Sequence, residues 1–278
     1  MPHFKLTLAY DGTPYYGWQV QPSLPTVQGL LSDALFRVAH ERVLPQGSGR
    51  TDAGVHALAQ VASFSLAAPI PAVNLHRALN HCLPNSIRIL SCEEVPPSFH
   101  ARHSAVSKTY EYRIFPLRTG NRLGAPSLDS ETWETNICPP FLAPFVWSCP
   151  WPLDLDALNR AAAYVVGTHD YTAFAATPST DEDTPATYVR TITHSCWRVE
   201  NGLLLYRVTA NGFLHHMVRN LVGTFVPCGT HRLPPDRIPA LLAARNRSLS
   251  GPTAPPSGLF LVSVTYPSNL EPRTSDLA

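Results

Sequence analysis

The sequence predicts an α+β protein built from two successive copies of a βαββαβ unit. In some segments apolar residues recur at helical spacing, and in others they alternate as in half-buried strands. The two kinds of segment follow one another in the same order in each half of the chain. In the second half, Asn201-Gly202 joins two alternating segments, and this dipeptide is a strong β-hairpin signal.

The first unit is expected to cover residues 1–105. Its elements are, in order, a strand at 4–10, a helix at 27–38, strands at 43–48 and 58–66, a helix at 73–82 and a strand at 87–95. Thr26 immediately precedes the first apolar residue of helical spacing, so we expect Thr26 to cap that helix.

The second unit is expected to cover residues 106–270. Its elements are a strand at 108–115, a helix at 155–166, strands at 188–199 and 203–209, a helix at 213–225 and a strand at 259–266. We expect Asp154 to cap the first of these helices and Gly167 to end it. Three segments fall outside the repeat and are interpreted as loops around a cleft: 117–152, which is an insertion, 176–185 and 248–257. Residues 271–278 are expected to form a tail.

Units of this order are ferredoxin-like, or like the RNA-recognition motif (RRM). We therefore expect the two units to share a mixed, largely antiparallel sheet. The helices would cover one face of that sheet, and the other face would carry a cleft for a ligand.

Composition is that of a soluble globular protein, with 44% apolar and 15% charged residues. The N-terminal segment alternates like a strand and does not resemble a signal peptide, and no apolar run approaches the roughly 20 residues of a membrane span. None of the six cysteines belongs to a C-x-x-C pair, so reduced thiols are expected rather than a metal site. These features predict a cytoplasmic protein.

Charge is unevenly distributed, although the formal net charge is only +1. Residues 37–118 contain nine basic and five acidic side chains, and residues 188–247 contain eight basic and two acidic ones. Residues 129–183 contain nine acidic side chains and one basic one. Such blocks suit a polyanionic ligand on one face, with ordinary solvated surface charge as the alternative explanation.

The most unusual segment, Gly47–His56, reads GSGRTDAGVH between two predicted strands. Its glycines allow positive φ angles and a close approach of the backbone to a ligand. It lacks the G-K-[ST] of a phosphate-binding P-loop, and no helix follows it as in a dinucleotide-binding fold. From the residues alone, Asp52 could also form only a local turn, with Arg50 in solvent.

The segment GRTDAGVHALAQVASF resembles the active-site motif of the tRNA pseudouridine synthase A family. Further segments resemble that family in the same order along nearly the whole chain. They are YDGT, GWQ and TVQG within 10–29, FHAR and SKTY within 99–110, FL and MVRN within 213–220, and APPSGL at 254–259. In the segment HDYTAF, the following Ala175 stands where the family commonly has arginine or another polar residue.

The resemblance implies an isomerisation of uridine in RNA, without cofactor or metal. By motif position Asp52 is the catalytic carboxylate, Tyr110 the aromatic residue over the uracil, and Arg219 the cation beside the carboxylate. Arg50 is the candidate for filling the space that the extruded base leaves. Lys108 and Leu259 are expected to contact the RNA or the uracil.

Most of these roles have structural alternatives. Tyr110 shares a strand face with Tyr112, and periodicity alone does not separate the two. Arg219 could be a surface residue of its helix, and Leu259 a core residue of its strand. His215 and His216 are expected on a helix, where neighbours point about 100° apart, so they do not predict a metal site.

The family resemblance implies a homodimeric enzyme acting on positions thirty-eight to forty of the tRNA anticodon stem-loop. The alternative from another class is a tandem RRM-like protein that binds RNA without catalysis. That alternative predicts stacking aromatic residues in a [KR]-G-[FY] run, which the sequence lacks. A metal-dependent nucleoside hydrolase would need clustered aspartates, and these are also lacking.

Overall fold

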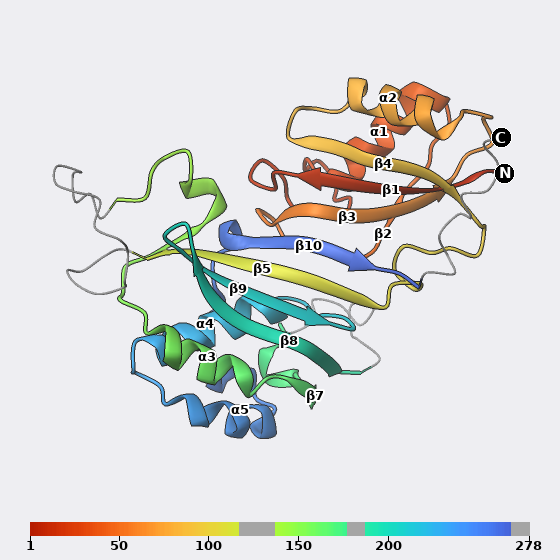
Figure 1. The fold of residues 1–278 in the computed structure, drawn as a ribbon. Coiled ribbons are helices and arrows are strands. Elements are labelled where there is room, and N and C mark those ends of the chain that lie inside the picture. The colour runs from red at the N-terminus through yellow and green to blue at the C-terminus, as the bar shows by residue number, and fades with distance from the viewer. Residues whose placement is uncertain (117–136, 177–186, 268–278) are drawn as a thin grey trace, which may run out of the picture. The chain divides into compact units, whose positions relative to one another are not determined.

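The computed structural model describes residues 1–116, 137–176 and 187–267. Within these residues the protein is an α+β fold with five α-helices and mostly antiparallel strands (Figure 1). The chain divides into two compact units, Met1–Thr109 with the described part of Phe260–Ala278, and Tyr110–Leu259. The boundaries fall within strands β5 (Ser107–Pro116) and β10 (Leu259–Thr265).

All six elements predicted for the first unit are present. They are β1 (His3–Tyr10), α1 (Val27–Ala39), β2 (Gln46–Gly47), β3 (His56–Ser65), α2 (Ala72–Cys82) and β4 (Ile87–Val95). The strands lie in the order β4-β1-β3-β10, and β2 pairs with β3. β1 is antiparallel to β3 and β4, whereas β10 is parallel to β3. The predicted strand at 43–48 is reduced to two residues, because Pro45 cannot donate to a ladder.

The core of the first unit follows from the alternation in β1. Phe4, Leu6, Leu8 and Tyr10 all lie on its buried side, and Phe4 pairs with Phe64 of β3. Helix α1 packs beside α2, and α2 packs against β4. The predicted cap of α1 is confirmed, because the Thr26 side chain accepts a hydrogen bond from the Gly29 amide.

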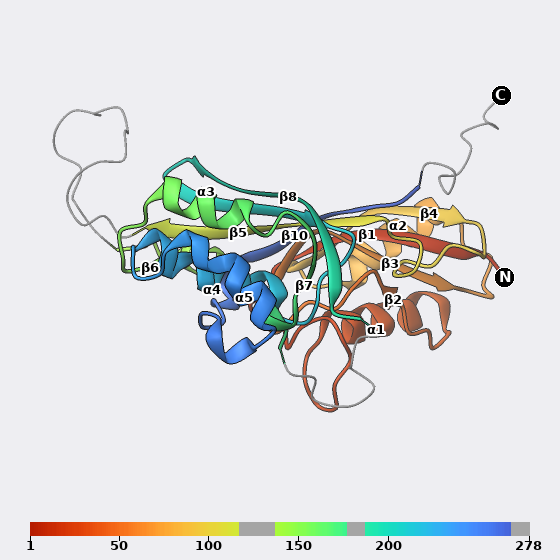
Figure 2. The same cartoon turned by 90° about the horizontal axis from the view of Figure 1, so that it is seen from below.

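The second unit has more elements than the repeat predicts. With the rest of β5 it contains β6 (Trp147–Cys149), α3 (Leu155–Ala163), β7 (Gly167–Asp170), β8 (Val189–Glu200), β9 (Leu203–Ala210), α4 (Met217–Gly229) and α5 (Ile238–Ala244). The strands lie in the order β5-β9-β8-β7, with β6 parallel to β5. The predicted hairpin joins β8 to β9, with Asn201 and Gly202 at φ 51° and 78°. Helix α3 contacts α4 and β8, α5 contacts β7, and Figures 1 and 2 both show the three helices grouped together.

Two predicted helix boundaries are wrong. Asp154 caps α3 as expected, but the helix ends at Ala163, and Gly167, at φ 111°, begins β7 instead. The helix predicted at 213–225 begins at Met217, because His215 and His216 form a turn in which His216 has a φ of 60°. Pro227 does not end this helix, which continues to Gly229.

The predicted loops contain short structure that the sequence patterns did not indicate. Strand β6 lies within 117–152, and 3-10 turns at Arg247–Leu249 and Pro256–Gly258 border the segment 248–257. Strand β7 and helix α5 were not predicted, since each is too short to show a period. Residues 117–136, 177–186 and the tail 271–278 lie outside the described part. Among the described helices, none combines the length and the apolar character that crossing a bilayer requires.

Candidate active site

The loop that carries Asp52 lies in the first unit, between β2 and β3. A buried amide side chain fixes the first part of this loop: Gln60 of β3 accepts a hydrogen bond from the Ser48 hydroxyl (2.7 Å) and donates to the Gly49 carbonyl (3.0 Å). The Ser48 amide also donates to the Val61 carbonyl (2.7 Å). Because Gln60 is fully buried, its amide replaces water for the loop's polar groups and holds the loop against β3.

The residue before Asp52 is fixed by two contacts from the N-terminal segment. The hydroxyls of Thr51 and Tyr10 lie 2.8 Å apart in a hydrogen bond, and the Thr51 carbonyl accepts from the Trp18 amide (3.0 Å). Burial raises the pKa of Tyr10 to about 12, against smaller effects of its hydrogen bonds to Thr51 and Gln60, so the phenol stays neutral at ordinary pH. The segments YDGT and GWQ therefore converge on the loop GRTDAGVH.

Two glycines let the N-terminal segment approach the loop closely. A Cβ on Gly17 would lie 2.5 Å from the Thr51 carbonyl oxygen, and Gly17 has a φ of 86°. A Cβ on Gly12 would lie 2.0 Å from the Val55 carbonyl oxygen. Both positions therefore require glycine, and the family-like glycine pattern has a steric reason here.

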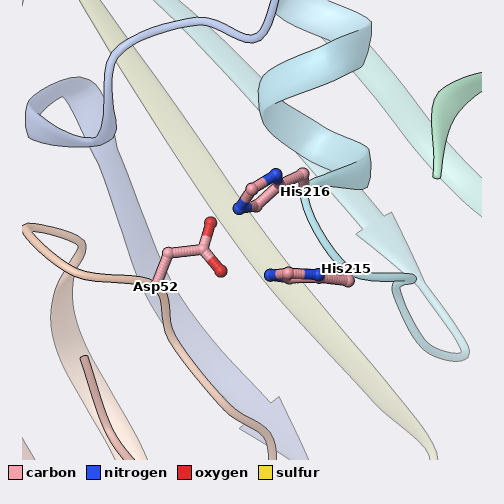
Figure 3. Close-up of side chains that lie close together, drawn as sticks. All are labelled: Asp52, His215 and His216. Carbon is pink, nitrogen blue, oxygen red and sulfur yellow. The ribbon is translucent and has the colours of Figure 1, made fainter. Parts of the chain in front are cut away.

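Asp52 itself lies at a tight turn of the loop. Its carbonyl accepts from the Val55 amide (3.1 Å), and Gly54 within this turn has a φ of 76°. The side chain is half-buried and extends from the loop that leads into β3 (Figure 3). A carboxylate is thus presented on a backbone that is fixed on both sides.

Two basic residues of the first unit accompany the loop. The exposed Arg50 donates from Nε to the Gln19 side-chain oxygen (3.0 Å), which links it to the segment GWQ. The Lys108 ammonium donates to the Ser48 carbonyl. The predicted residues Arg50 and Asp52 therefore lie in one loop of the first unit, and the Lys108 side chain contacts this loop from strand β5.

Tyr110, Arg219 and Leu259 belong to the second unit. Tyr110 is 7% exposed, and its ring packs edge-on against Phe213 with centroids 5.0 Å apart. Tyr112 is fully buried and donates its hydroxyl to the Pro255 carbonyl (2.7 Å). Burial raises the pKa of Tyr112 well above its usual value, while the charge of Arg219 acts in the opposite direction. The structure thus distinguishes Tyr112, which is fully buried and bonded to the backbone, although strand periodicity alone did not separate it from Tyr110.

Arg219 lies in the first turn of α4 and is tied to the segment 254–259. Its Nε donates to the Ala254 carbonyl (2.8 Å), and its own carbonyl accepts from the Ala254 amide (3.1 Å). Leu259, which is 6% exposed, follows Gly258, where a Cβ would lie 2.7 Å from the Tyr112 ring. The motifs MVRN and APPSGL therefore meet in the second unit.

His215 and His216 precede helix α4 and do not belong to it (Figure 3). Their ring centroids are 4.0 Å apart, so the two imidazoles lie next to each other. The expectation that they point about 100° apart on a helix is therefore wrong, because the helix begins one residue later than this pair.

Several residues that hold this site were missed from the sequence. Gln60 lies within the segment GRTDAGVHALAQVASF, and its role was not predicted. A polar residue at a buried strand position could have indicated that role. Asn220 and Arg247 were missed as well, and only their contacts in the fold reveal them. Ala175 is 5% exposed, so the departure from the family pattern lies at a buried position.

The chain matches the family model described as tRNA pseudouridine synthase over residues 7–104 and 161–267. Curated relatives named tRNA pseudouridine synthase A include those of Solibacter usitatus and Moorella thermoacetica, each 45% identical, over 267 and 269 residues. The relative from Caldicellulosiruptor bescii is 38% identical over 266 residues. Each of these alignments covers 96% of this chain and 100% of the relative. The chain belongs to the tRNA pseudouridine synthase family.

Proposed function

We propose that this protein isomerises uridine to pseudouridine at positions thirty-eight to forty of the tRNA anticodon stem-loop, without cofactor or metal. The observation that carries the proposal is the Asp52 loop, in which three family motifs converge on a half-buried carboxylate. Full-length relatives that are named tRNA pseudouridine synthase A support the tRNA substrate.

The proposed chemistry is an intramolecular transfer with no net gain or loss of atoms. Asp52 attacks the nucleotide, at C1′ or at the base, or stabilises cationic character at C1′ as carboxylates do in glycoside chemistry. The bond from uracil N1 to C1′ breaks, the base turns, and C5 bonds to C1′. Where Asp52 has bonded to C1′ or to the base, that bond breaks again and the carboxylate is restored. The hydrogen at C5 then leaves as a proton, and N1 regains one.

Tyr110 is proposed to stack on the uracil and to assist the removal of the C5 proton. Tyr112 is a poorer candidate for this role, because it is fully buried and its hydroxyl donates to the Pro255 carbonyl at 2.7 Å. Leu259 is proposed to pack against the uracil, and Lys108 to contact the RNA backbone. The edge-on Phe213 ring would hold the Tyr110 ring in a fixed plane.

Arg219 is proposed to keep the Asp52 carboxylate ionised and oriented, since a nearby cation lowers a carboxyl pKa. Its Nε contact with the Ala254 carbonyl supports this role, because it fixes the plane of the guanidinium. Arg50 is proposed to occupy the space that the extruded uridine leaves in the RNA.

The finer architecture is proposed from the same resemblance. The order β1-α1-β2-β3-α2-β4 supports a ferredoxin-like unit over residues 1–105. A second such unit is proposed over residues 106–270 from the sequence repeat. We propose that the enzyme is a cytoplasmic homodimer that holds tRNA in basic clefts. Sedimentation of the purified protein with and without tRNA would measure the number of chains in each complex.

The experiment that tests the function is mass spectrometry of tRNA after cyanoethylation, which adds a mass label to pseudouridine. Bulk tRNA from a deletion strain should lack the label at positions thirty-eight to forty, and purified protein should restore it. As a control, transcripts with cytidine at these three positions should gain no label. Unchanged labelling in the deletion strain, together with no label on an unmodified transcript that was incubated with the purified protein, would reject the proposal.

A further inference from the structure

A network around Asn220 joins helix α4 to the segment 246–258 of the second unit. The Arg247 guanidinium donates from Nη2 to the Asn220 side-chain oxygen (2.9 Å) and to the Thr253 hydroxyl (3.1 Å), and from Nη1 to the Gly251 carbonyl (2.9 Å). The Thr253 hydroxyl donates to the same Asn220 oxygen (2.7 Å). We call Asn220, Arg247 and Thr253 the Arg247 clamp.

The side-chain nitrogen of Asn220 is hydrogen-bonded as well. Its Nδ2 donates to the Phe174 carbonyl (2.8 Å), and the whole residue is inaccessible to solvent. The side-chain oxygen and the amide nitrogen of Asn220 are therefore both satisfied by fixed partners. Loss of Arg247 would leave part of a buried polar network without its donor, which is costly in a low-dielectric interior.

Backbone contacts bring the same segment directly against α4. A Cβ on Gly223 would lie 1.6 Å from the Pro252 carbonyl oxygen, and one on Gly251 would lie 2.2 Å from the Gly223 carbonyl oxygen. The Gly251 amide also donates to the Thr224 hydroxyl (2.9 Å). The backbone of this segment therefore lies directly against α4, next to the Arg247 clamp.

The next residues of this segment contact Arg219. Ala254 follows Thr253 directly and makes two hydrogen bonds with Arg219: its carbonyl accepts from Arg219 Nε, and its amide donates to the Arg219 carbonyl. The Pro255 carbonyl accepts a hydrogen bond from the Tyr112 hydroxyl. A shift of Thr253 would therefore move the carbonyl that fixes the Arg219 guanidinium, with only one peptide bond between them.

We infer that Arg247, through Asn220 and Thr253, is a positioning residue that sets the orientation of the Arg219 guanidinium. This inference rests on the proposed function, in which Arg219 acts beside the Asp52 carboxylate. Arg247 donates three hydrogen bonds within the protein, and its planar fork suits this arrangement better than a lysine ammonium would. Its role is transmitted through the segment 253–254 and requires no contact with the RNA.

The test uses full-length Arg247→Met, Thr253→Val and Thr253→Ser, with Arg237→Met as a matched control. Arg237 is an exposed arginine of the same unit, and its substitution makes the same change of charge. Single-turnover tritium release from uracil C5 and tRNA affinity are measured for each variant. We expect Arg247→Met and Thr253→Val to slow release by about tenfold or more, since small misplacements of catalytic groups are costly. The affinity for tRNA should change by no more than about twofold, because neither residue is proposed to contact the RNA phosphates. Thr253→Ser keeps the hydroxyl and should stay near the wild-type rate.

A double-mutant cycle separates positioning from general stabilisation. If Arg247 acts through Arg219, Arg247→Met should have little further effect on the rate when Arg219 is already alanine. The same fold-loss in both backgrounds, or a loss of affinity without a loss of rate, would overturn the inference.

A readout without activity keeps the inference separate from the proposed function. The NMR signal of the Arg219 Nε–H should shift or broaden in Arg247→Met and stay unchanged in Arg237→Met. Absence of pseudouridine formation by the wild-type protein would reject the function, whereas an unchanged Arg219 signal in folded Arg247→Met would reject the positioning role. An active wild type with a full rate in Arg247→Met would also reject the positioning role alone.

Discussion

Substitution of Gly17 by alanine should disturb the Asp52 loop more than it disturbs the fold. Gly17 has a φ of 86°, and a Cβ there would lie 2.5 Å from the Thr51 carbonyl oxygen. The next residue, Trp18, donates its amide to that same carbonyl at 3.0 Å. The new methyl group would therefore push on the residue that precedes Asp52.

Two effects are expected to lower the free energy of unfolding of Gly17→Ala. Holding alanine in the left-handed region costs about 1 to 2 kcal/mol, and loss of the Trp18 to Thr51 hydrogen bond costs about another 1 kcal/mol. The total is about 2 to 3 kcal/mol. Gly202→Ala is the matched control, because Gly202 has a φ of 78° but no atom within 4 Å of the added Cβ. Gly202→Ala should therefore lower the free energy of unfolding by only about 1 to 2 kcal/mol.

The assay compares urea unfolding and single-turnover tritium release for the two variants. A displacement of Asp52 by about 1 Å should slow Gly17→Ala by about 100-fold, whereas Gly202→Ala should keep the wild-type rate. If both variants lose equal stability and both remain fully active, the close approach of Gly17 to Thr51 does not control the Asp52 loop.

Three further predictions follow from charge and burial. Raising salt from about 50 to about 200 mM should weaken tRNA binding by about 100-fold or more, with log affinity linear in log salt, and a flat profile would contradict the basic clefts. Arg50→Ala should reduce turnover on base-stacked tRNA uridine far more than it reduces affinity, and equal losses would make Arg50 an ordinary phosphate contact. Burial raises the pKa of Tyr10 to about 12, so folding stability should be complete below about pH 10 and fall between about pH 10 and pH 12. Urea titrations across this range should show a smaller fall for Tyr10→Phe, and an identical fall would contradict the assignment.

The fold was predictable where one physical signal dominates. The alternation in β1, the Thr26 cap and the Asn201-Gly202 turn are local, and each is confirmed. The start of α4 was predicted four residues too early, because apolar residues continue the helical pattern into a turn whose geometry depends on His216 at positive φ. Strand β7 and helix α5 are too short for their periods to be distinguished from chance.

The sequence predicts candidate site residues, but it does not predict the contacts that hold them. The motif singled out Asp52 because a carboxylate in a glycine-rich loop is unusual, and the family pattern supplied its role. The sequence did not reveal that Gln60 and Tyr10 hold this loop, because these contacts join residues 11 to 50 positions apart. For the same reason, the Arg247 clamp emerged only from the folded chain.

The proposed function depends most on Asp52 as the catalytic carboxylate. Asparagine is nearly isosteric with aspartate, but its amide is a poor nucleophile and carries no charge to stabilise an electron-poor C1′. The direct measurement is single-turnover tritium release from uracil C5 by Asp52→Asn, beside tRNA affinity, with circular dichroism to confirm equal folding. We expect tRNA affinity to be retained or slightly increased and tritium release to slow by at least about 10³-fold. Release near the wild-type rate by the folded variant would show that Asp52 is not the catalytic carboxylate.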